Sequence, residues 1–222
     1  MIKQTSTLLI TNASKSALAY PLSLLAALLM GLFSLAGLLF PAAVYPSEDL
    51  RRSFVSNDVV NLLVGLPVLL VSMGLARRGK LIGWLLWPGA LFYITYNYLA
   101  YAFARFISLP FGLYLALAGL SVYAILRLLS NLDGAAVQER LRGRVPERWG
   151  GGVLVGLGAL FFLRSLAEGA SALSGQAALT SPEWAVLIAD LLITPLWVVG
   201  GVQLWRRRAV GRAHRGHRRQ EG

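Results

Sequence analysis

The chain has 222 residues, of which 56% are hydrophobic and only 14% are charged. Soluble domains carry nearer to a quarter charged residues, so this composition excludes an ordinary soluble domain and a disordered chain. It predicts a membrane protein. The absence of cysteine also excludes a disulfide scaffold, a thiolate zinc site and a cysteine nucleophile.

Six apolar runs in the chain are long enough to cross a bilayer, because a spanning helix needs about 20 predominantly apolar residues. We therefore predict an all-α bundle of six transmembrane helices, at about 17–40, 59–76, 81–104, 107–126, 150–173 and 184–205. Residues 1–16 then form an N-terminal segment, and 206–222 form a basic tail. The first four runs contain no Asp, Glu, Lys or Arg.

The distribution of basic residues predicts that both termini are cytoplasmic. With that orientation, 17 of the 21 Lys and Arg residues fall in inner segments, where such residues are retained. The preponderance of Arg over Lys suggests a GC-rich bacterial genome, and so a multi-pass protein of a bacterial inner membrane.

The net charge of +11 is concentrated in the Arg-rich tail and invites a nucleic-acid interpretation. Basic residues just cytoplasmic of a last span are, however, what the orientation rule and attraction to anionic lipids both produce. We expect the bilayer and anionic lipid headgroups at the inner face as partners, and no nucleic acid. A homo-oligomer or a partner membrane protein stays open.

Two connecting segments have the pattern of short helices. In the outer loop before the second span, Ser47 can cap a helix whose first turn carries Glu48 and Asp49. In the long inner loop, residues 133–144 have the pattern of an interfacial helix. The Gly152 and Gly156 pair at the start of the fifth span predicts close internal helix packing, with an oligomer seam as the alternative.

Polar residues in the outer halves of the spans are the candidate site, because ionisable groups in lipid are costly and usually face a partner or a cavity. In the third span, four polar residues fall on one helical face. The candidate ligand-binding residues are Asp58, Asn61, Tyr93, Tyr96, Asn97, Tyr101, Arg164, Glu168 and Asp190. We expect Arg164 to pair with Asp190 at similar depth, with an in-helix pair to Glu168 as the alternative.

These residues allow three functions. The first is binding or transport of a small solute or lipid in an outward-facing polar pocket, which the mid-span prolines Pro67 and Pro195 favour. The second is a structural or accessory subunit whose polar residues hold helices together. The third is an intramembrane enzyme, for which the sequence offers no catalytic constellation. No metal site or cofactor is predicted.

The orientation can be tested with reporters fused after Gly222 or inserted near Gly79 or Gly175. Because the basic residues flank the first two sites, reporters there should report the cytoplasm, and one near Gly175 should report the exterior. If the reporters near Gly79 and Gly175 report the same side of the membrane, the predicted number of spans is too large by one.

Overall fold

The structure is a computed structural model that describes residues 13–105, 108–130 and 147–217, with side chains at 18–105, 108–130 and 151–202. These residues form helices joined by short connections and contain no strand. The all-α prediction is therefore confirmed for the described residues. The predicted helix at 133–144 lies outside them, as does the segment 1–12.

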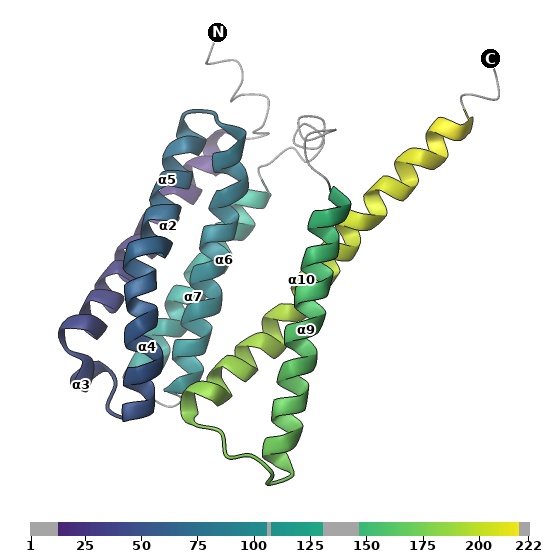
Figure 1. Cartoon of the computed structure of the whole chain (residues 1–222). Helices are drawn as coiled ribbons and strands as arrows, with labels where there is room; N and C mark the ends of the chain where they lie inside the picture. Colours follow the sequence, from purple (N-terminus) through teal and green to yellow (C-terminus); the bar gives the residue numbers. More distant parts are fainter. Residues whose placement is uncertain (1–12, 106–107, 131–146, 218–222) are drawn as a thin grey trace. The chain divides into compact units, whose positions relative to one another are not determined.

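The helices are α2 (Ala13–Leu39), α3 (Pro41–Val44), α4 (Glu48–Val60), the π-helix η1 (Asn61–Gly65), α5 (Leu66–Arg77), α6 (Leu81–Ala104), α7 (Leu109–Leu129), α9 (Glu147–Leu173) and α10 (Ser181–His217) (Figure 1). Five segments are long and apolar enough to span a membrane: Leu18–Leu39, Glu48–Arg77, Leu109–Leu129, Gly151–Leu173 and Ser181–Val202. This is typical of a multi-pass membrane protein.

The predicted third span is the helix α6, which has the expected bounds but is not among the five. Its tyrosines, tryptophans and Asn97 lower its hydropathy. More than half of its residues are buried by the neighbouring helices. A helix shielded in this way does not need a lipid-facing surface, which explains its lower hydropathy.

Two helices extend beyond the predicted spans. The second span is the end of a longer helical segment that begins at Glu48, capped by Ser47, whose hydroxyl accepts from the Leu50 amide at 3.3 Å. Asp58 therefore lies well inside this segment rather than near its start. The last helix continues past Trp205 to His217, so much of the predicted tail is helical.

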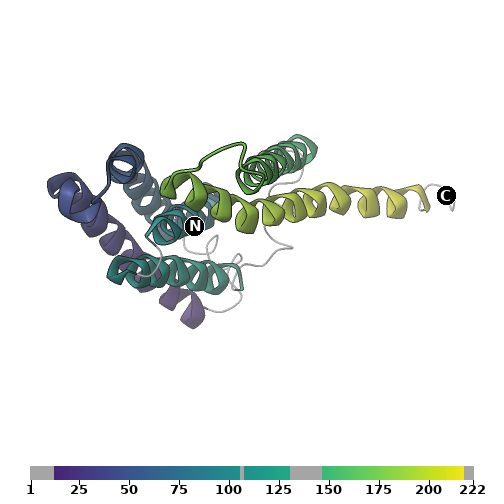
Figure 2. The same ribbon diagram turned by 90° about the horizontal axis from the view of Figure 1, so that it is seen from below.

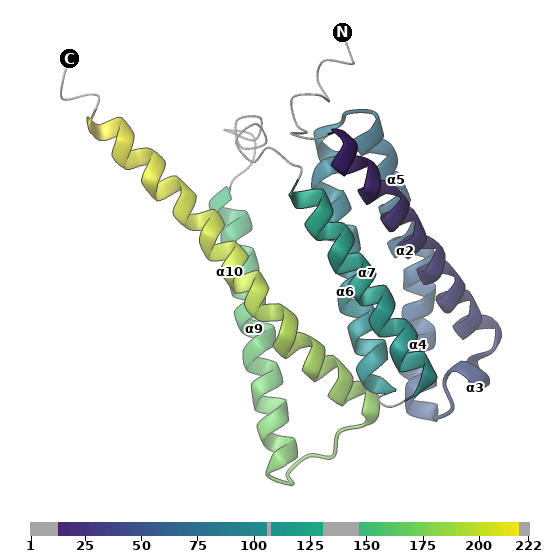
Figure 3. The same cartoon turned by 180° about the vertical axis from the view of Figure 1, so that it is seen from behind.

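The described residues divide into two compact units, one from within 1–140 and 180–186 and the other from within 141–179 and 187–222. In the first, α2 packs against α7 on one side and α4 and α5 on the other, and α6 packs against α5 and α7. Figure 3 shows α2 and α7 side by side, and Figure 2 shows the bundle end-on. The core lies between these helices.

Glycine makes two of the sharp turns. Gly79 (φ 71°) and Gly175 (φ 74°) have the left-handed backbone that favours glycine. After α5, the Gly79 amide bonds the Ala76 carbonyl and the Lys80 amide bonds the Leu75 carbonyl, which is the pattern of a Schellman motif. This turn returns the chain so closely that a Cβ on Gly83 would lie 2.3 Å from the Ala76 nitrogen.

In the second unit, α9 and α10 pack through glycines. A Cβ on Gly201 would lie 2.7 Å from the Gly151 carbonyl, and one on Gly158 would lie 3.1 Å from the Thr194 carbonyl. A Cβ on Gly152 or Gly156 would meet nothing within 4 Å among the described residues of this unit. Among these residues the close approach uses the neighbouring glycines Gly151, Gly158 and Gly201 instead.

Candidate functional site

Asp58 of α4 is the acidic centre of a buried polar cluster in the first unit. Its side chain is only 1% exposed. Tyr45 donates to Asp58 Oδ2 at 2.7 Å, and Tyr101 of α6 donates to Oδ1 at 2.8 Å. In the described part of the chain, no Lys or Arg lies within ion-pairing distance of this carboxylate.

Asn61, fully buried about one turn further along, makes a second contact with α6 and extends the cluster to α2. Its Oδ1 accepts from the Tyr93 hydroxyl of α6 at 2.8 Å, and its Nδ2 donates to Ser34 Oγ of α2 at 3.1 Å. Asn57 Nδ2 donates to Asn97 Oδ1 at 2.9 Å. The cluster therefore joins α2, α4, η1 and α6 by side-chain hydrogen bonds.

The π-helix begins at Asn61, inside the cluster. The Leu66 amide bonds the Asn61 carbonyl, five residues back, directly before Pro67, which has no amide hydrogen to donate. A π turn inserted in an α-helix is often found at functional sites. Gly65 ends this turn, and a Cβ there would lie 2.7 Å from Tyr93 Cε1, so glycine allows the Tyr93 ring to reach Asn61.

The short helix α3 closes the cluster at one end of the bundle. Arg105 at the end of α6 donates to the Val44 carbonyl, which ties α3 to that helix. Tyr45 follows directly and is buried. Burial, and then the Asp58 carboxylate beside it, raise the pKa of the Tyr45 hydroxyl, so this group stays a proton donor at neutral pH.

Gly37 provides the space in which Asp58 and Tyr45 meet. A Cβ at this position of α2 would lie 2.0 Å from Asp58 Oδ2 and 2.9 Å from the Tyr45 oxygen. Gly37 lies two residues before the end of α2. The carboxylate is therefore within about one turn of the end of the bundle that carries α3.

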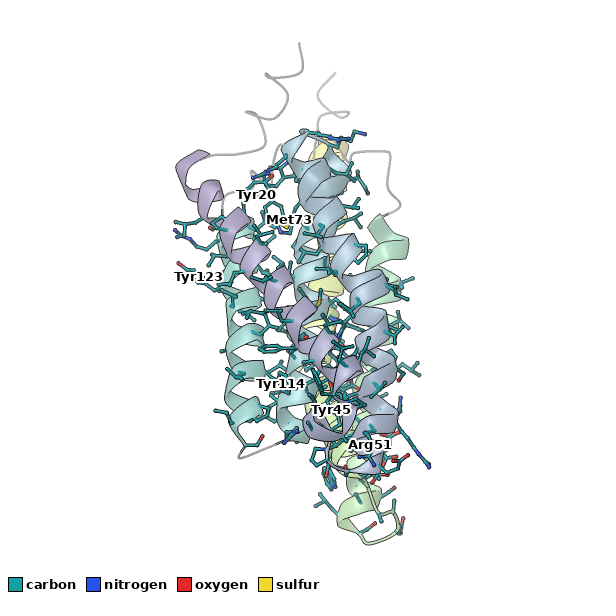
Figure 4. The ribbon with its side chains drawn as sticks, turned by 90° about the vertical axis from the view of Figure 1, so that its left-hand side faces the viewer. Tyr20, Tyr45, Arg51, Met73, Tyr114 and Tyr123 are labelled. Atoms are coloured by element: carbon teal, nitrogen blue, oxygen red, sulfur yellow. The ribbon has the colours of Figure 1, made fainter. Side chains whose placement is uncertain are left out.

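Aromatic rings surround the carboxylate. The Phe54 and Tyr101 rings are stacked with centroids 4.4 Å apart, and the Tyr45 ring lies 5.8 Å from Phe54. Tyr98 and Tyr114 continue this packing, at 5.2 and 5.5 Å from Tyr101. Figure 4 shows Tyr45 and Tyr114 at the same end of the bundle, with Arg51 nearby.

The structure brings together five of the predicted site residues: Asp58, Asn61, Tyr93, Asn97 and Tyr101. Tyr96 is half-buried on α6. The other three belong to the second unit. There, Arg164 donates to Glu168 at 2.7 Å, which is the in-helix alternative, and its side chain is 56% exposed. Asp190 is buried and accepts from Ser165 Oγ at 3.2 Å.

Sequence reasoning missed several members of the cluster. Ser34 lies in a predominantly apolar run, and Tyr45 lies in a connection between predicted spans. Tyr98 is five residues from Tyr93, so it falls outside the helical face that was predicted from the spacing of Tyr93, Tyr96, Asn97 and Tyr101. One signal was available, because Tyr98 and Tyr101 are three residues apart on a helix and so share a face.

Comparisons of the chain with protein-family models, curated proteins and solved structures found no match. The site is therefore interpreted from its own geometry.

The contact at Gly37 predicts a large loss of stability for Gly37→Ala. The added methyl would overlap the Asp58 carboxylate, and overpacking of this kind costs about 1 to 3 kcal/mol or more. The melting temperature in detergent should fall sharply. Gly31→Ala on the same helix is the control, because its Cβ would make only ordinary contact at 3.7 Å. Equal melting temperatures for the two variants would contradict the placement of Asp58.

Proposed function

We propose that the protein binds a small cationic solute at the Asp58 cluster and moves it across the membrane. The observation that carries this proposal is the buried Asp58 carboxylate, which has two phenol donors but no cationic partner in the described part of the chain. A charge of this kind at membrane depth is costly without a partner and usually marks a functional site. A cation would supply the missing charge.

The surroundings of the carboxylate suit a cation better than an anion or an apolar ligand. The electron-rich faces of aromatic rings attract cations, and the attraction grows when the ion is desolvated. Tyr45, Phe54 and Tyr101 provide such rings beside Asp58. Phenol and amide oxygens of the cluster offer further ligands for a positive charge.

The structure corresponds in this proposal to a closed state, since the two phenol hydroxyls occupy the carboxylate oxygens. Binding would displace the Tyr45 hydroxyl from Asp58 and move the connection that carries α3. The π-helix and Pro67 supply a second place where the backbone can change, because the regular hydrogen-bond ladder is already interrupted there.

The structural alternative is also supported by a specific observation. The cluster contains no buried side-chain nitrogen or oxygen without a hydrogen-bond partner in the described part of the chain. Buried polar groups that satisfy one another can serve only to hold helices together. For the third function, an intramembrane enzyme, the two buried carboxylates Asp58 and Asp190 belong to different units, and no observation favours it.

We also propose six spans with both termini in the cytoplasm of a bacterial inner membrane. The helix α6 has 24 residues, and a length of about 36 Å is enough to cross the hydrocarbon core. At one end of the first unit lie Arg77, Arg78 and Lys80, whereas at the other Glu48 forms ion pairs with two neighbouring arginines. This difference supports the orientation.

Thiol labelling distinguishes transport from the structural alternative, because the chain has no native cysteine. Ser34→Cys places a near-isosteric thiol in the cluster. In membrane vesicles it should react with a small impermeant cationic methanethiosulfonate added outside, and tetramethylammonium should slow the reaction severalfold. In an Asp58→Asn background that protection should disappear.

Ser121→Cys is the matched control. Ser121 is also fully buried in a spanning helix, but its hydroxyl bonds only the Leu117 carbonyl of its own helix, at 2.9 Å. Its thiol should not react. If Ser34→Cys is as unreactive as Ser121→Cys, the cluster is dry and the transport proposal is wrong.

A further inference from the structure

A groove of about 540 Å³ lies between α2 and α5, at the opposite end of these helices from the Asp58 cluster. Its walls are mostly apolar and include Pro21, Leu24, Leu70 and Met73. Its volume is within the usual range for ligand sites. Figure 4 shows Tyr20 and Met73 close together between the two helices.

The groove opens sideways toward the surroundings of the bundle rather than into its core. Leu24 is 57% exposed and Leu70 is 43% exposed, although both belong to membrane-spanning segments. Side chains exposed there face lipid. A molecule that enters the groove therefore arrives from the bilayer, which favours a hydrocarbon chain over a water-soluble solute.

Arg77 places a positive charge at one end of the groove. Its guanidinium lies over the Tyr20 ring, 4.8 Å from the centroid. The Tyr20 ring lies 4.5 Å from that of Trp87, whose indole nitrogen donates to Ser23 Oγ at 2.9 Å. This chain of contacts fixes the Tyr20 ring and, through it, the charge.

Within the described residues, the charge at this end of the groove has no acidic partner. Arg77, Arg78 and Lys80 are exposed at the end of α5 and its turn, and among the described residues none of them forms an ion pair. From Arg77 to Leu70 the helix rises about 10 Å. The groove thus combines an apolar wall of that length with a cation at the end where lipid headgroups lie.

We propose that this groove is a binding site for one anionic phospholipid of the inner leaflet. Its acyl chain would lie along Leu24, Leu70 and Met73, and its phosphate would contact Arg77. This site is separate from the Asp58 cluster and does not depend on the solute proposal. The alternative is diffuse attraction of lipids to all basic residues at this end.

The test measures how phosphatidylglycerol raises the melting temperature of the full chain in detergent, with phosphatidylcholine as the neutral lipid. Arg77→Gln should weaken the apparent affinity for phosphatidylglycerol about tenfold, because it removes a charge-assisted contact to the phosphate that is worth about 1.5 kcal/mol. Arg78→Gln is the matched control, because it removes an adjacent charge that does not line the groove. The affinity of Arg78→Gln for phosphatidylglycerol should stay within twofold of that of the native chain.

A second pair of variants tests the apolar wall. Gly74 lines the groove, and a Cβ there would meet nothing within 4 Å. Gly74→Leu should therefore occupy the groove, and the melting temperature without lipid checks that the bundle is intact. Gly74→Leu should abolish the preference for phosphatidylglycerol. Gly112→Leu on α7, which is equally open, should retain it. Three outcomes would each overturn the proposal. Arg77→Gln and Arg78→Gln could lose equal affinity for phosphatidylglycerol, or Gly74→Leu could bind it as well as the native chain does. Phosphatidylcholine could also raise the melting temperature as much as phosphatidylglycerol does.

Discussion

The hydrogen bonds to the buried Asp58 carboxylate are the constraint on which the rest of the first unit depends. A carboxylate away from water needs donors in fixed positions. Tyr45 supplies one donor from the connection between α3 and α4, and Tyr101 supplies the other from α6. Both hydroxyls must lie close to the carboxylate. Gly37 is required because any side chain there would occupy the space of the carboxylate. One buried group thus accounts for the position of α3 and for the glycine in α2.

The two ends of the first unit are built for different chemistry. At the Tyr45 end, the buried polar side chains of the Asp58 cluster have hydrogen-bond partners, so a solute can reach the carboxylate only if hydrogen bonds are exchanged. At the Arg77 end, a groove is already open and its charge has no acidic partner among the residues that the structure describes. The cluster therefore needs a conformational change to bind a ligand, whereas the groove needs none. A membrane protein with both features can take a solute at one face while lipid holds it at the other.

The sequence predicts the helices well, because runs of about 20 apolar residues leave few alternatives to a spanning helix. From spacing alone it also places Tyr93, Asn97 and Tyr101, three residues of the cluster, on one face of α6. It misses Tyr45 and Ser34, because nothing local marks a loop tyrosine or a lone serine as the partner of a distant carboxylate. Periodicity also does not reveal that the segment 48–60 continues the second span as a helix, since that segment is polar. Partners from separate helices are determined by packing, which a single sequence does not display.

The most direct measurement is a double-mutant cycle on Tyr45 and Asp58, in which the free energy of unfolding of each variant is measured in mixed detergent micelles. A hydrogen bond to a charged group contributes about 1.5 to 3 kcal/mol. Tyr45→Phe should lower the free energy of unfolding by this amount in the native chain and by much less in an Asp58→Ala background. If Tyr45→Phe has the same effect in both backgrounds, the two residues are not coupled, and Asp58 is not the group that holds the cluster together.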